Sequence, residues 1–537
     1  MTPQARPSRR EGKPPHRLRR WPGPAFVLAA LAATGYLHLH YAGVPDADAF
    51  WHLRHASLYA QRGLFDSSFP WAAYSVMSRL PGDVWYGFHL LLIPFSYLPG
   101  PFLQIKVAGA CLLASLLILT WWSLRRLGVA YPWLWPFVLL LIAPGQLWRL
   151  QMTRPHLISL GLGLLLLSFS IKGKWWQVGL ISLTLTFFHL NFFWLTPMVV
   201  GMGMVVRTAV EKRLEWRALL AAILGWVAGW LLRPDPMATL QLLNVQIVQL
   251  MSAKRQGIPL EFGSELFPMD PAHALAYYRT LLPLWVAAVG VFIVALLRRR
   301  IGGAAEVRAL LWSSLALSLL CFNLMCLVSR RAADLWILFA IVLIAAVLTM
   351  LQAGANTRAT PPVRWARGGV LLLGALLLAH ASLFSIREEA RQMALTPPAE
   401  RGKAMGLWLR EHARPGEIVC NVHWADAPEL FYWSPQSRFV GGMDPIFQYV
   451  HDPARYWKIH HLALGDVLPD TCGAVACTPE NREDLHTVLR RDFQAAHVLL
   501  NQAEDQELLS LLRRDRRFRI GFEDAAFAIA EVRPTPR

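Results

Sequence analysis

Long apolar runs recur through most of the chain, and they limit its possible folds more than any other feature. A helix needs about 20 apolar residues to cross the hydrocarbon core of a bilayer. Runs of that length or somewhat shorter lie at residues 24–42, 107–122, 131–147, 157–171, 175–188, 191–206, 218–232, 281–297, 308–328, 334–352 and 368–386. Hydrophobic residues make up 55% of the sequence and charged residues 16%, which is too apolar for an ordinary soluble protein. The sequence therefore predicts a polytopic α-helical membrane protein with about 11 spans in a transmembrane domain over residues 24–386.

One further apolar segment, residues 84–99, has a different character. Pro94 lies inside it and Pro99 ends it. Proline removes a backbone donor and bends a helix, which suits an element that enters the membrane without crossing it. We expect this segment to fold into the outer leaflet.

Basic residues set the expected orientation. The net charge is +18, but much of it lies in short clusters between apolar runs, where the positive-inside rule explains it without a nucleic-acid partner. Residues 1–23 form a basic, disordered cytoplasmic leader, with a cleaved signal peptide as the alternative. If successive spans alternate in direction, loops 43–100 and 233–280 and residues 387–537 lie outside. We therefore expect an inner (cell) membrane protein of the cell envelope.

The sequence after residue 387 alternates between helical and strand-like patterns. Helices are expected at Ala404–Glu411 and residues 504–515. Strands are expected at Glu417–Val422, Arg438–Gly442, Ala495–Asn501, Phe518–Phe522 and Ala526–Val532. These patterns predict an extracytoplasmic C-terminal α/β domain large enough for a core of its own.

Two of the six cysteines stand close together in this domain. Cys472 and Cys477 can close a small disulfide loop in an oxidising compartment. Two free thiols are an equally good interpretation, because Cys420 has no evident partner.

The first outer loop contains the most informative motif. Asp46 and Asp48 follow the first apolar run, immediately before Phe50 and Trp51. Two carboxylates in a partly desolvated cleft can bind a divalent cation or supply a general base. Alternatively, Asp46 caps the following helix and Asp48 lies in its first turn, where the helix dipole favours negative charge.

The run Asp48-Ala-Phe-Trp-His52-Leu-Arg54 resembles the first-loop motif of oligosaccharyltransferase catalytic subunits. With its many spans and outer C-terminal domain, the chain more broadly resembles the GT-C superfamily of membrane glycosyltransferases. The resemblance implies a GT-C-like fold and transfer of a sugar from a polyprenyl-phosphate carrier to a lipid, glycan or protein acceptor on the outer face. It further implies Asp48 or Asp46 as the base, a cleft that can include His52 and Arg54, and a divalent cation such as Mg or Mn where the family uses one.

The chain departs from the oligosaccharyltransferase pattern at two points. The turn Trp148–His156 carries no acidic pair, and His423-Trp424-Ala425-Asp426 is only faintly similar to the family's sequon-binding motif. A monosaccharide-transferring relative, closer to the mannosyl- and aminoarabinosyl-transferases, fits better and need not use a metal.

A carrier phosphate at the outer interface calls for cationic partners, and Arg is best suited to hold it through forked hydrogen bonds. The expected topology puts five candidates at that level: Arg330, Arg331, Arg154, His156 and His189. The alternative is that they are interfacial side chains reaching toward lipid headgroups.

Acceptor contacts are expected from the outer parts of the chain. Glu261 and Glu265 can line the same cleft, and Trp424 and Asp426 can stack on and hydrogen-bond to a sugar. Alternatively, the two glutamates lie on a solvated surface, and Trp424 and Asp426 belong to a packed core.

Two rival functions remain. One is a transporter or lipid flippase, which the scarcity of charge in the middle of the apolar runs disfavours, and the other is a non-catalytic scaffold.

Overall fold

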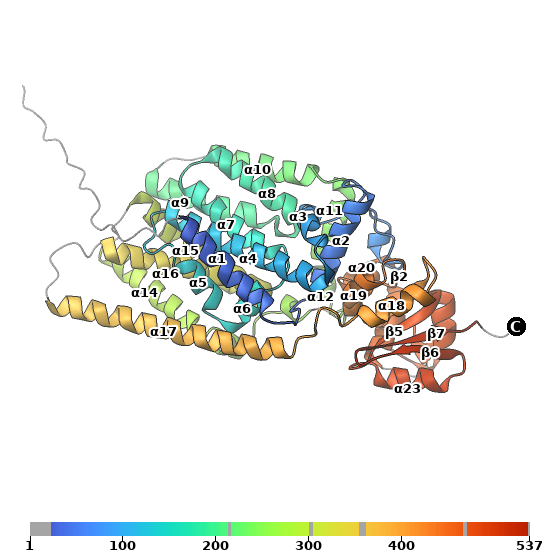
Figure 1. Ribbon diagram of the computed structural model, residues 1–537. Helices are drawn as coiled ribbons and strands as arrows, with labels where there is room; N and C mark the ends of the chain where they lie inside the picture. Colours follow the sequence, from blue (N-terminus) through green and yellow to red (C-terminus); the bar gives the residue numbers. More distant parts are fainter. Residues whose placement is uncertain are drawn as a thin grey trace, which may run out of the picture.

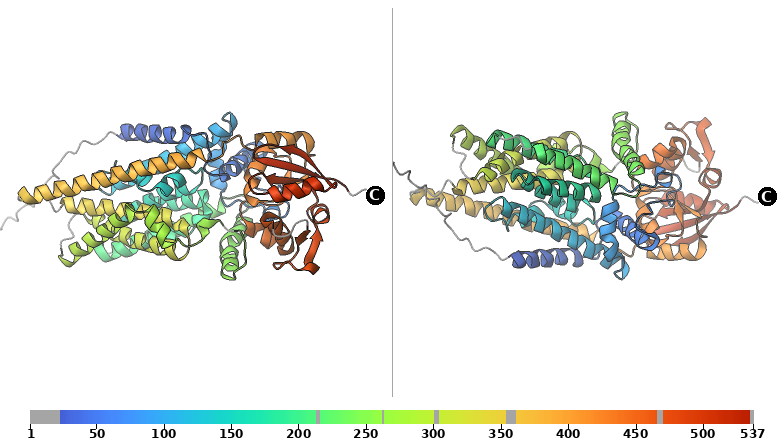
Figure 2. Two further views of the ribbon diagram at one scale, coloured as in Figure 1. Left: turned by 90° about the horizontal axis from the view of Figure 1, so that it is seen from below. Right: turned by 90° about the horizontal axis from the view of Figure 1, so that it is seen from above.

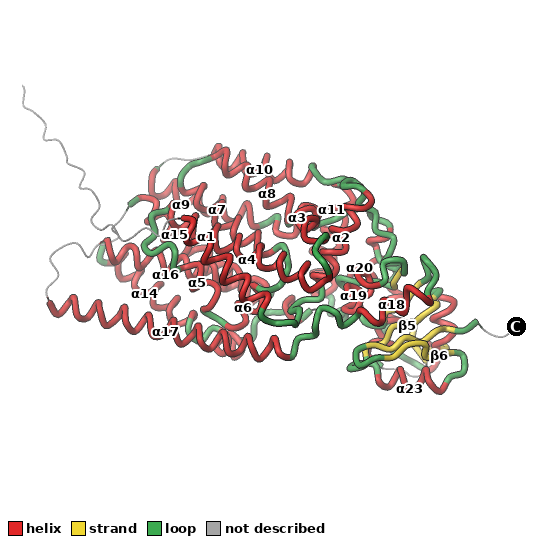
Figure 3. The backbone as a smooth tube through the Cα atoms, in the orientation of Figure 1, coloured by secondary structure: helices red, strands yellow, loops and turns green. Residues whose placement is uncertain are grey.

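The computed structural model describes residues 23–212, 216–261, 263–299, 304–353, 361–465 and 470–534. The leader expected at residues 1–23 lies, apart from Gly23, outside the described residues. The described chain is elongated, with a helical bundle at one end and a C-terminal domain containing the strands at the other (Figures 1 and 3).

The bundle is built from the helices that the apolar runs predict. Its longer helices are α1 (Gly23–Leu39), α4 (Gly100–Arg126), α7 (His156–Ile171), α8 (Trp175–Phe188), α9 (Leu195–Glu211), α10 (Trp216–Leu231), α14 (Leu281–Leu297), α15 (Ala305–Leu327), α16 (Ala333–Ala353) and α17 (Pro361–Ala394). Every residue of α7 is buried, so this helix lies at the centre of the bundle. Helix α17 runs along one side toward the C-terminal domain (Figure 2).

Several shorter helices lie at the end of the bundle that faces the C-terminal domain, among them α2 (Asp48–Arg62), α3 (Tyr86–Ser96), α11 (Pro236–Asn244) and α12 (Leu250–Arg255) (Figure 1). The other short helices before α14 are α5 (Trp135–Leu141), α6 (Pro144–Leu150) and α13 (Pro271–Tyr277). Helical turns η1 (Val76–Ser78), η2 (Leu190–Phe192), η3 (Val245–Gln249), η4 (Ser264–Leu266) and η5 (Arg330–Ala332) join them. The run 131–147 is divided between α5 and α6, because Pro144 begins a new helix after an extended residue.

Four of the described helices are long and apolar enough to cross a membrane, and six spans result if each of two sharply bent pairs counts as one. Helices α1, α3, α7 and α8 are apolar but shorter than 18 residues. A multi-pass membrane protein is therefore supported, while the count of 11 spans, the half-inserted segment 84–99 and the orientation stay predictions.

The C-terminal domain has the predicted α/β character. Its helices are α18 (Lys403–His412), α19 (Ala427–Trp433), α20 (Pro445–His451), α21 (Pro453–Leu464), α22 (Leu485–Thr487) and α23 (Gln506–Arg514), with turns η7 (Trp424–Asp426), η8 (Pro479–Asn481) and η9 (Val488–Asp492). Its strands are β1 (Ile418–Asn421), β2 (Arg438–Phe439), β3 (Asp470–Cys472), β4 (Arg482–Asp484), β5 (Ala495–Asn501), β6 (Phe518–Glu523) and β7 (Phe527–Val532). The main sheet has the order β2-β1-β5-β7-β6, parallel from β2 to β5 and antiparallel from β5 to β6. The two helices and four of the five strands expected from the sequence are thereby confirmed, and the strand expected at Arg438–Gly442 is present only at Arg438–Phe439.

The segment between α2 and α3 extends this sheet at its β2 edge. Ala72 pairs in parallel with Phe439, and the amide of Ala73 donates to the Phe439 carbonyl at 2.7 Å. Trp51 of α2 is fully buried against Phe431 and Phe439. The aromatic residues of the first-loop motif therefore join the bundle to the C-terminal domain.

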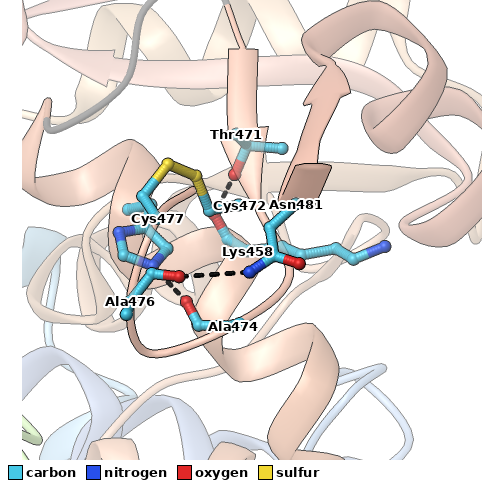
Figure 4. The surroundings of a disulfide bond; sticks show 8 residues. Lys458, Thr471, Cys472, Ala474, Ala476, Cys477 and Asn481 are labelled. Carbon is cyan, nitrogen blue, oxygen red and sulfur yellow. Dashed lines mark hydrogen bonds between the residues drawn. A yellow bond between two sulfur atoms is a disulfide. The ribbon is translucent and has the colours of Figure 1, made fainter. Parts of the chain in front are cut away.

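The structure pairs Cys472 with Cys477 in a disulfide (Figure 4). The loop that it closes is also held by hydrogen bonds from Asn481 to the Ala476 carbonyl and from Thr471 to the Lys458 carbonyl. Cys420 is a buried free thiol on β1. Of the two interpretations left open by the sequence, the structure has the bonded one.

The expected orientation can be tested by labelling single cysteines in intact cells. Gln61, Ala454 and Lys174 are all exposed, the first two near the C-terminal domain and the third between α7 and α8. In a background without the native free thiols, Gln61→Cys and Ala454→Cys should react with a membrane-impermeant maleimide, and Lys174→Cys should react only after lysis. Protection of position 454 in intact cells would contradict the orientation.

Candidate active site

Arg154 lies between the carboxylates of Asp46 and Asp48. Its Nε and Nη2 atoms donate to Asp46 at 2.5 and 2.7 Å, and Nη2 also contacts Asp48 Oδ2 at 2.7 Å. Asp46 is buried, whereas the Asp48 side chain is 24% exposed. Asp46 is thus the buried member of the pair, and Asp48 is the member that is accessible from solvent.

A third carboxylate extends this arrangement into a charged cluster. Glu265 accepts hydrogen bonds from Arg331 Nη2 and Nε, and its carboxylate lies 3.8 Å from both Arg154 and Arg149. Arg149 in turn donates to both oxygens of Asp334 at 2.7–3.1 Å. We define the charged cluster as Asp46, Asp48, Arg149, Arg154, Glu265, Arg331 and Asp334.

Local sequence explains how these side chains converge. The Asp46 carboxylate accepts the backbone amide of Asp48 at 3.2 Å, so it shapes the turn that begins α2 as well as binding Arg154. Arg154 precedes Pro155, which disfavours a helical conformation and keeps Arg154 in the turn between α6 and α7. Helix α2 has Ala47 as its N-cap, without a side-chain cap, so Asp46 lies just before the cap and binds the amide of the first helical residue instead. The predicted role of Asp46 in binding a cation or a proton stays a prediction.

Two carboxylates of the cluster differ in the direction in which their pKa is shifted. Burial raises the pKa of Asp48 to about 6 against the opposing pull of Arg154, with Asp46 adding to the rise. Burial also opposes ionisation of Glu265, but Arg331 and Arg154 outweigh it and lower its pKa to about 2. At neutral pH, Glu265 is a fixed anion, and Asp48 is ionised yet basic enough to accept a proton.

A pocket of about 470 Å³ is lined by residues that flank the acid pair in sequence. Val44, Pro45, Ala47 and Phe50 line it together with Trp148, the end of α17 and the linker that follows α17. Arg401 and Glu429 are its charged lining residues; they lie 3.6 Å apart, and burial raises the pKa of Glu429 to about 7. The pocket is otherwise mostly apolar, which suits a substrate with a hydrocarbon portion.

Of the five predicted phosphate ligands, Arg154 and Arg331 belong to the charged cluster. Arg330 instead donates to the Pro268 carbonyl at 3.4 Å. His156 contacts the Arg149 carbonyl, and His189 contacts the Ser159 hydroxyl at 2.7 Å. These three side chains stabilise neighbouring turns and helices in the structure.

Of the predicted substrate contacts, Glu265 belongs to the charged cluster, and the others lie outside it. His52 is hydrogen-bonded to His89, and Glu261 lies 3.5 Å from His460. Arg54 is at the α2–α19 contact near Tyr432. Trp424 and the buried Asp426 form turn η7, where Asn501 approaches the Asp426 carboxylate at 3.5 Å.

Arg149 and Asp334 are members of the cluster that the sequence did not predict. A signal for Arg149 existed, because it precedes Arg154 by five residues and lies just after the apolar run 131–147. Its partner Asp334 is 185 residues away, and no local pattern indicates that pairing.

The acid pair does not fit a divalent cation in this arrangement. Both oxygens of Asp46 already accept from the Arg154 guanidinium, and Oδ2 of Asp48 forms an ion pair with it, so Arg154 supplies the compensating positive charge. We therefore assign no step of the chemistry to a metal at this pair.

Comparison with known proteins shows what the fold is. No protein-family model and no characterised protein sequence matches the chain. Among solved structures, ArnT from Cupriavidus metallidurans in the apo state matches with a TM-score of 0.50 at 13% identity, over 94% of this chain and 97% of that one. The same protein bound to undecaprenyl phosphate gives 0.48 at 14% identity with the same coverage. An oligosaccharyltransferase from Archaeoglobus fulgidus, in complex with Zn and sulfate, matches with a TM-score of 0.50 at 11% identity, over 89% of this chain and 68% of that one. The expected fold is thus confirmed: this chain has a GT-C-like fold.

Proposed function

We propose that this protein is an integral-membrane glycosyltransferase that moves a sugar from a polyprenyl-phosphate carrier to an acceptor on the outer face of the membrane. The charged cluster is the observation that carries the proposal. It combines an accessible carboxylate of raised pKa with arginines beside an apolar pocket, at the end of the bundle that meets the C-terminal domain. The disulfide between Cys472 and Cys477 supports an oxidising compartment for that domain.

In the proposed reaction, Asp48 is the general base. The acceptor oxygen attacks the anomeric carbon, the bond from that carbon to the phosphate oxygen breaks, and the carrier phosphate leaves with the bonding electrons. The acceptor proton passes to Asp48. A base with a pKa of about 6 is mostly ionised at pH 7 and still accepts a proton effectively.

The arginines would stabilise the phosphate before and after the bond breaks. Arg331 is suited to this role because its side chain is 47% exposed and is held by Glu265 at a fixed position. Arg154 compensates the charge of the acid pair, and thereby keeps Asp48 ionised near a negatively charged carrier. The adjoining pocket, with its Arg401–Glu429 pair, is where we expect the lipid or acceptor to bind.

The proposal is tested by assaying the purified full-length protein in detergent with a panel of polyprenyl-phosphate sugars. Release of polyprenyl phosphate together with a glycosylated acceptor is the expected result. Binding of carriers with no turnover in either native membranes or detergent would favour the scaffold interpretation, and movement of carrier between leaflets without sugar transfer would favour a flippase.

Arg331 and Arg330 form a matched pair for testing the phosphate contact. Arg331→Ala removes a contact made in both the ground state and the transition state, so we expect KM for the carrier to rise about tenfold or more with a smaller change in kcat. Arg330→Ala should stay within about twofold of the native enzyme, since Arg330 contacts only backbone near the cluster. Equal effects of the two substitutions would remove Arg331 from the proposed role.

A further inference from the structure

A second group of polar side chains lies buried between α2 and α3, outside the charged cluster. His52 Nδ1 and His89 Nε2 are 2.8 Å apart, and His89 Nδ1 is 2.6 Å from Asp83 Oδ2. His52 is 2% exposed, His89 fully buried and Asp83 6% exposed. These three residues form one continuous hydrogen-bonded chain.

The contacts around Asp83 show which group donates in its bond to His89. Its carboxylate accepts from the Tyr59 hydroxyl at 2.9 Å and from the Trp85 amide at 2.8 Å, in addition to His89. Burial opposes ionisation of Asp83, but His89 and these donors hold its pKa below the ordinary value. An ionised carboxylate only accepts, so His89 carries its proton on Nδ1.

A buried cation lies next to this chain. Arg233 is 4% exposed, and it donates to the Asp83 carbonyl at 2.6 Å and to the carbonyls of Thr186 and Phe187. His89 Nε2 and His52 Nδ1 share the second hydrogen bond of the chain. Asp83 thus fixes the proton of His89 on Nδ1 and, through that ring, the position of His52.

His52 connects this chain to the proposed base. It follows Asp48 by four residues in α2, one turn along the same face of the helix. Trp85 and Phe88 pack against the His52 ring edge-on, at 5.5 and 5.1 Å between ring centroids. A hydrogen bond at one edge and aromatic packing around the ring together fix the rotation of α2 about its axis.

A metal ion is the competing occupant of this region, because potential ligand atoms of His55, Asp83 and His89 lie within 4.8 Å of one another. The ring geometry does not suit one. His55 and His89 are stacked at 4.6 Å with an interplanar angle of 11°, so their in-plane lone pairs do not converge on one point. His89 already uses both nitrogens, in bonds to His52 and Asp83.

We propose that Asp83, His89 and His52 are positioning residues: a relay of hydrogen bonds that sets the rotation of α2 and so holds Asp48 toward Arg154. The relay touches neither carrier nor acceptor and acts through Asp48. The expected effect of the relay on kcat rests on the proposed function.

The test is a double-mutant cycle in the full-length protein. Asp83→Asn removes the pure acceptor that fixes the His89 proton, and His52→Phe removes the hydrogen bond while keeping a ring in the aromatic site. Each should lower kcat about tenfold with KM nearly unchanged. The double variant should have a kcat no lower than that of the less active single variant, because both substitutions break the same hydrogen-bonded chain. His52→Asn, whose amide can donate from near the position of Nδ1, should recover most of the rate.

His55→Phe is the matched control, since it keeps the stack on His89 and lies outside the relay; it should stay within about twofold of native kcat. Losses that simply add, a failed rescue by Asn, or a change confined to KM would overturn the relay. So would a stoichiometric metal that co-purifies with the native protein and is lost in His55→Phe.

A readout independent of catalysis separates this inference from the proposed function. With Cys at position 48, the reaction rate with a water-soluble thiol reagent reports the orientation of α2. Asp83→Asn should change that rate several-fold while leaving Cys at the exposed position 61 unaffected. If that shift is seen and the native protein has no transferase activity, the proposed function is wrong and the relay stands. If the native protein is active and the rate at position 48 is unchanged, the relay is wrong and the proposed function stands.

Discussion

Asp48→Asn is expected to lower kcat by about a hundred- to ten-thousand-fold, the range that a positioned general base contributes. The amide keeps the shape of the side chain and can still contact its neighbours, but it cannot accept the acceptor's proton. Carrier binding should persist, because Arg331 and the pocket are unchanged. Single-turnover assays with purified protein, with carrier binding measured in parallel, check both parts.

The pH profile gives the same assignment a second check. Burial raises the pKa of Asp48 to about 6, and the base works only when ionised. The rate should therefore be constant above pH 7 and fall about tenfold per pH unit below pH 6. Asp48→Asn should lack this acidic limb. If instead Asp46→Asn is inactive and Asp48→Asn is fully active, the roles within the acid pair are reversed, and full activity of both variants would exclude a catalytic role for the loop.

Arg154→Gln is expected to have the second large effect, on stability as well as rate. The substitution leaves Asp46, which is 8% exposed, and its neighbour Asp48 without their cation, close to the anionic Glu265. Removing one partner from a buried ion pair costs about 3–5 kcal/mol, and the 22% exposure of Arg154 puts this case toward the lower end. We expect a clear drop in thermal unfolding temperature and loss of most activity.

The same substitution should move the acidic limb of any residual activity to higher pH, because Arg154 opposes the rise in the pKa of Asp48. Arg154→Lys is the informative comparison. It keeps the charge but cannot donate to Asp46 and Asp48 in a forked geometry, so stability should recover more than rate. A native pH profile and native stability in Arg154→Gln would show that the acid pair does not depend on this arginine.

The sequence predicts the helices well because apolar length and turn residues are local signals. The strands Ala495–Asn501 and Phe527–Val532 follow from the same kind of local pattern. Spans are harder to predict, since α7 is apolar on all sides yet only 16 residues long and surrounded by protein. An apolar helix of this kind is equally suited to contact with lipid and to a protein core, so its composition does not distinguish the two.

The candidate site could be predicted only in part, for a related reason. Asp46, Asp48, Arg154 and Arg331 are individually recognisable as charges at the ends of apolar runs. Their pairing depends on tertiary contacts across 108 residues between Asp46 and Arg154, and 66 between Glu265 and Arg331. His52 was expected beside the base, but burial against Trp85 and Phe88 turns it toward His89 instead.

The pairing of the segment around the acid pair with the C-terminal domain has a consequence for how the protein is made. Ala73 and Tyr74 hydrogen-bond to Phe439 and Val440, and the Val44 amide donates to the Pro397 carbonyl, so both flanks of the acid pair are held by chain synthesised more than 300 residues later. During synthesis the bundle helices can insert in order, but these backbone groups of Val44, Ala73 and Tyr74 meet their partners only when the last part of the chain emerges. We therefore expect the surroundings of Asp46 and Asp48 to be completed at the end of translation.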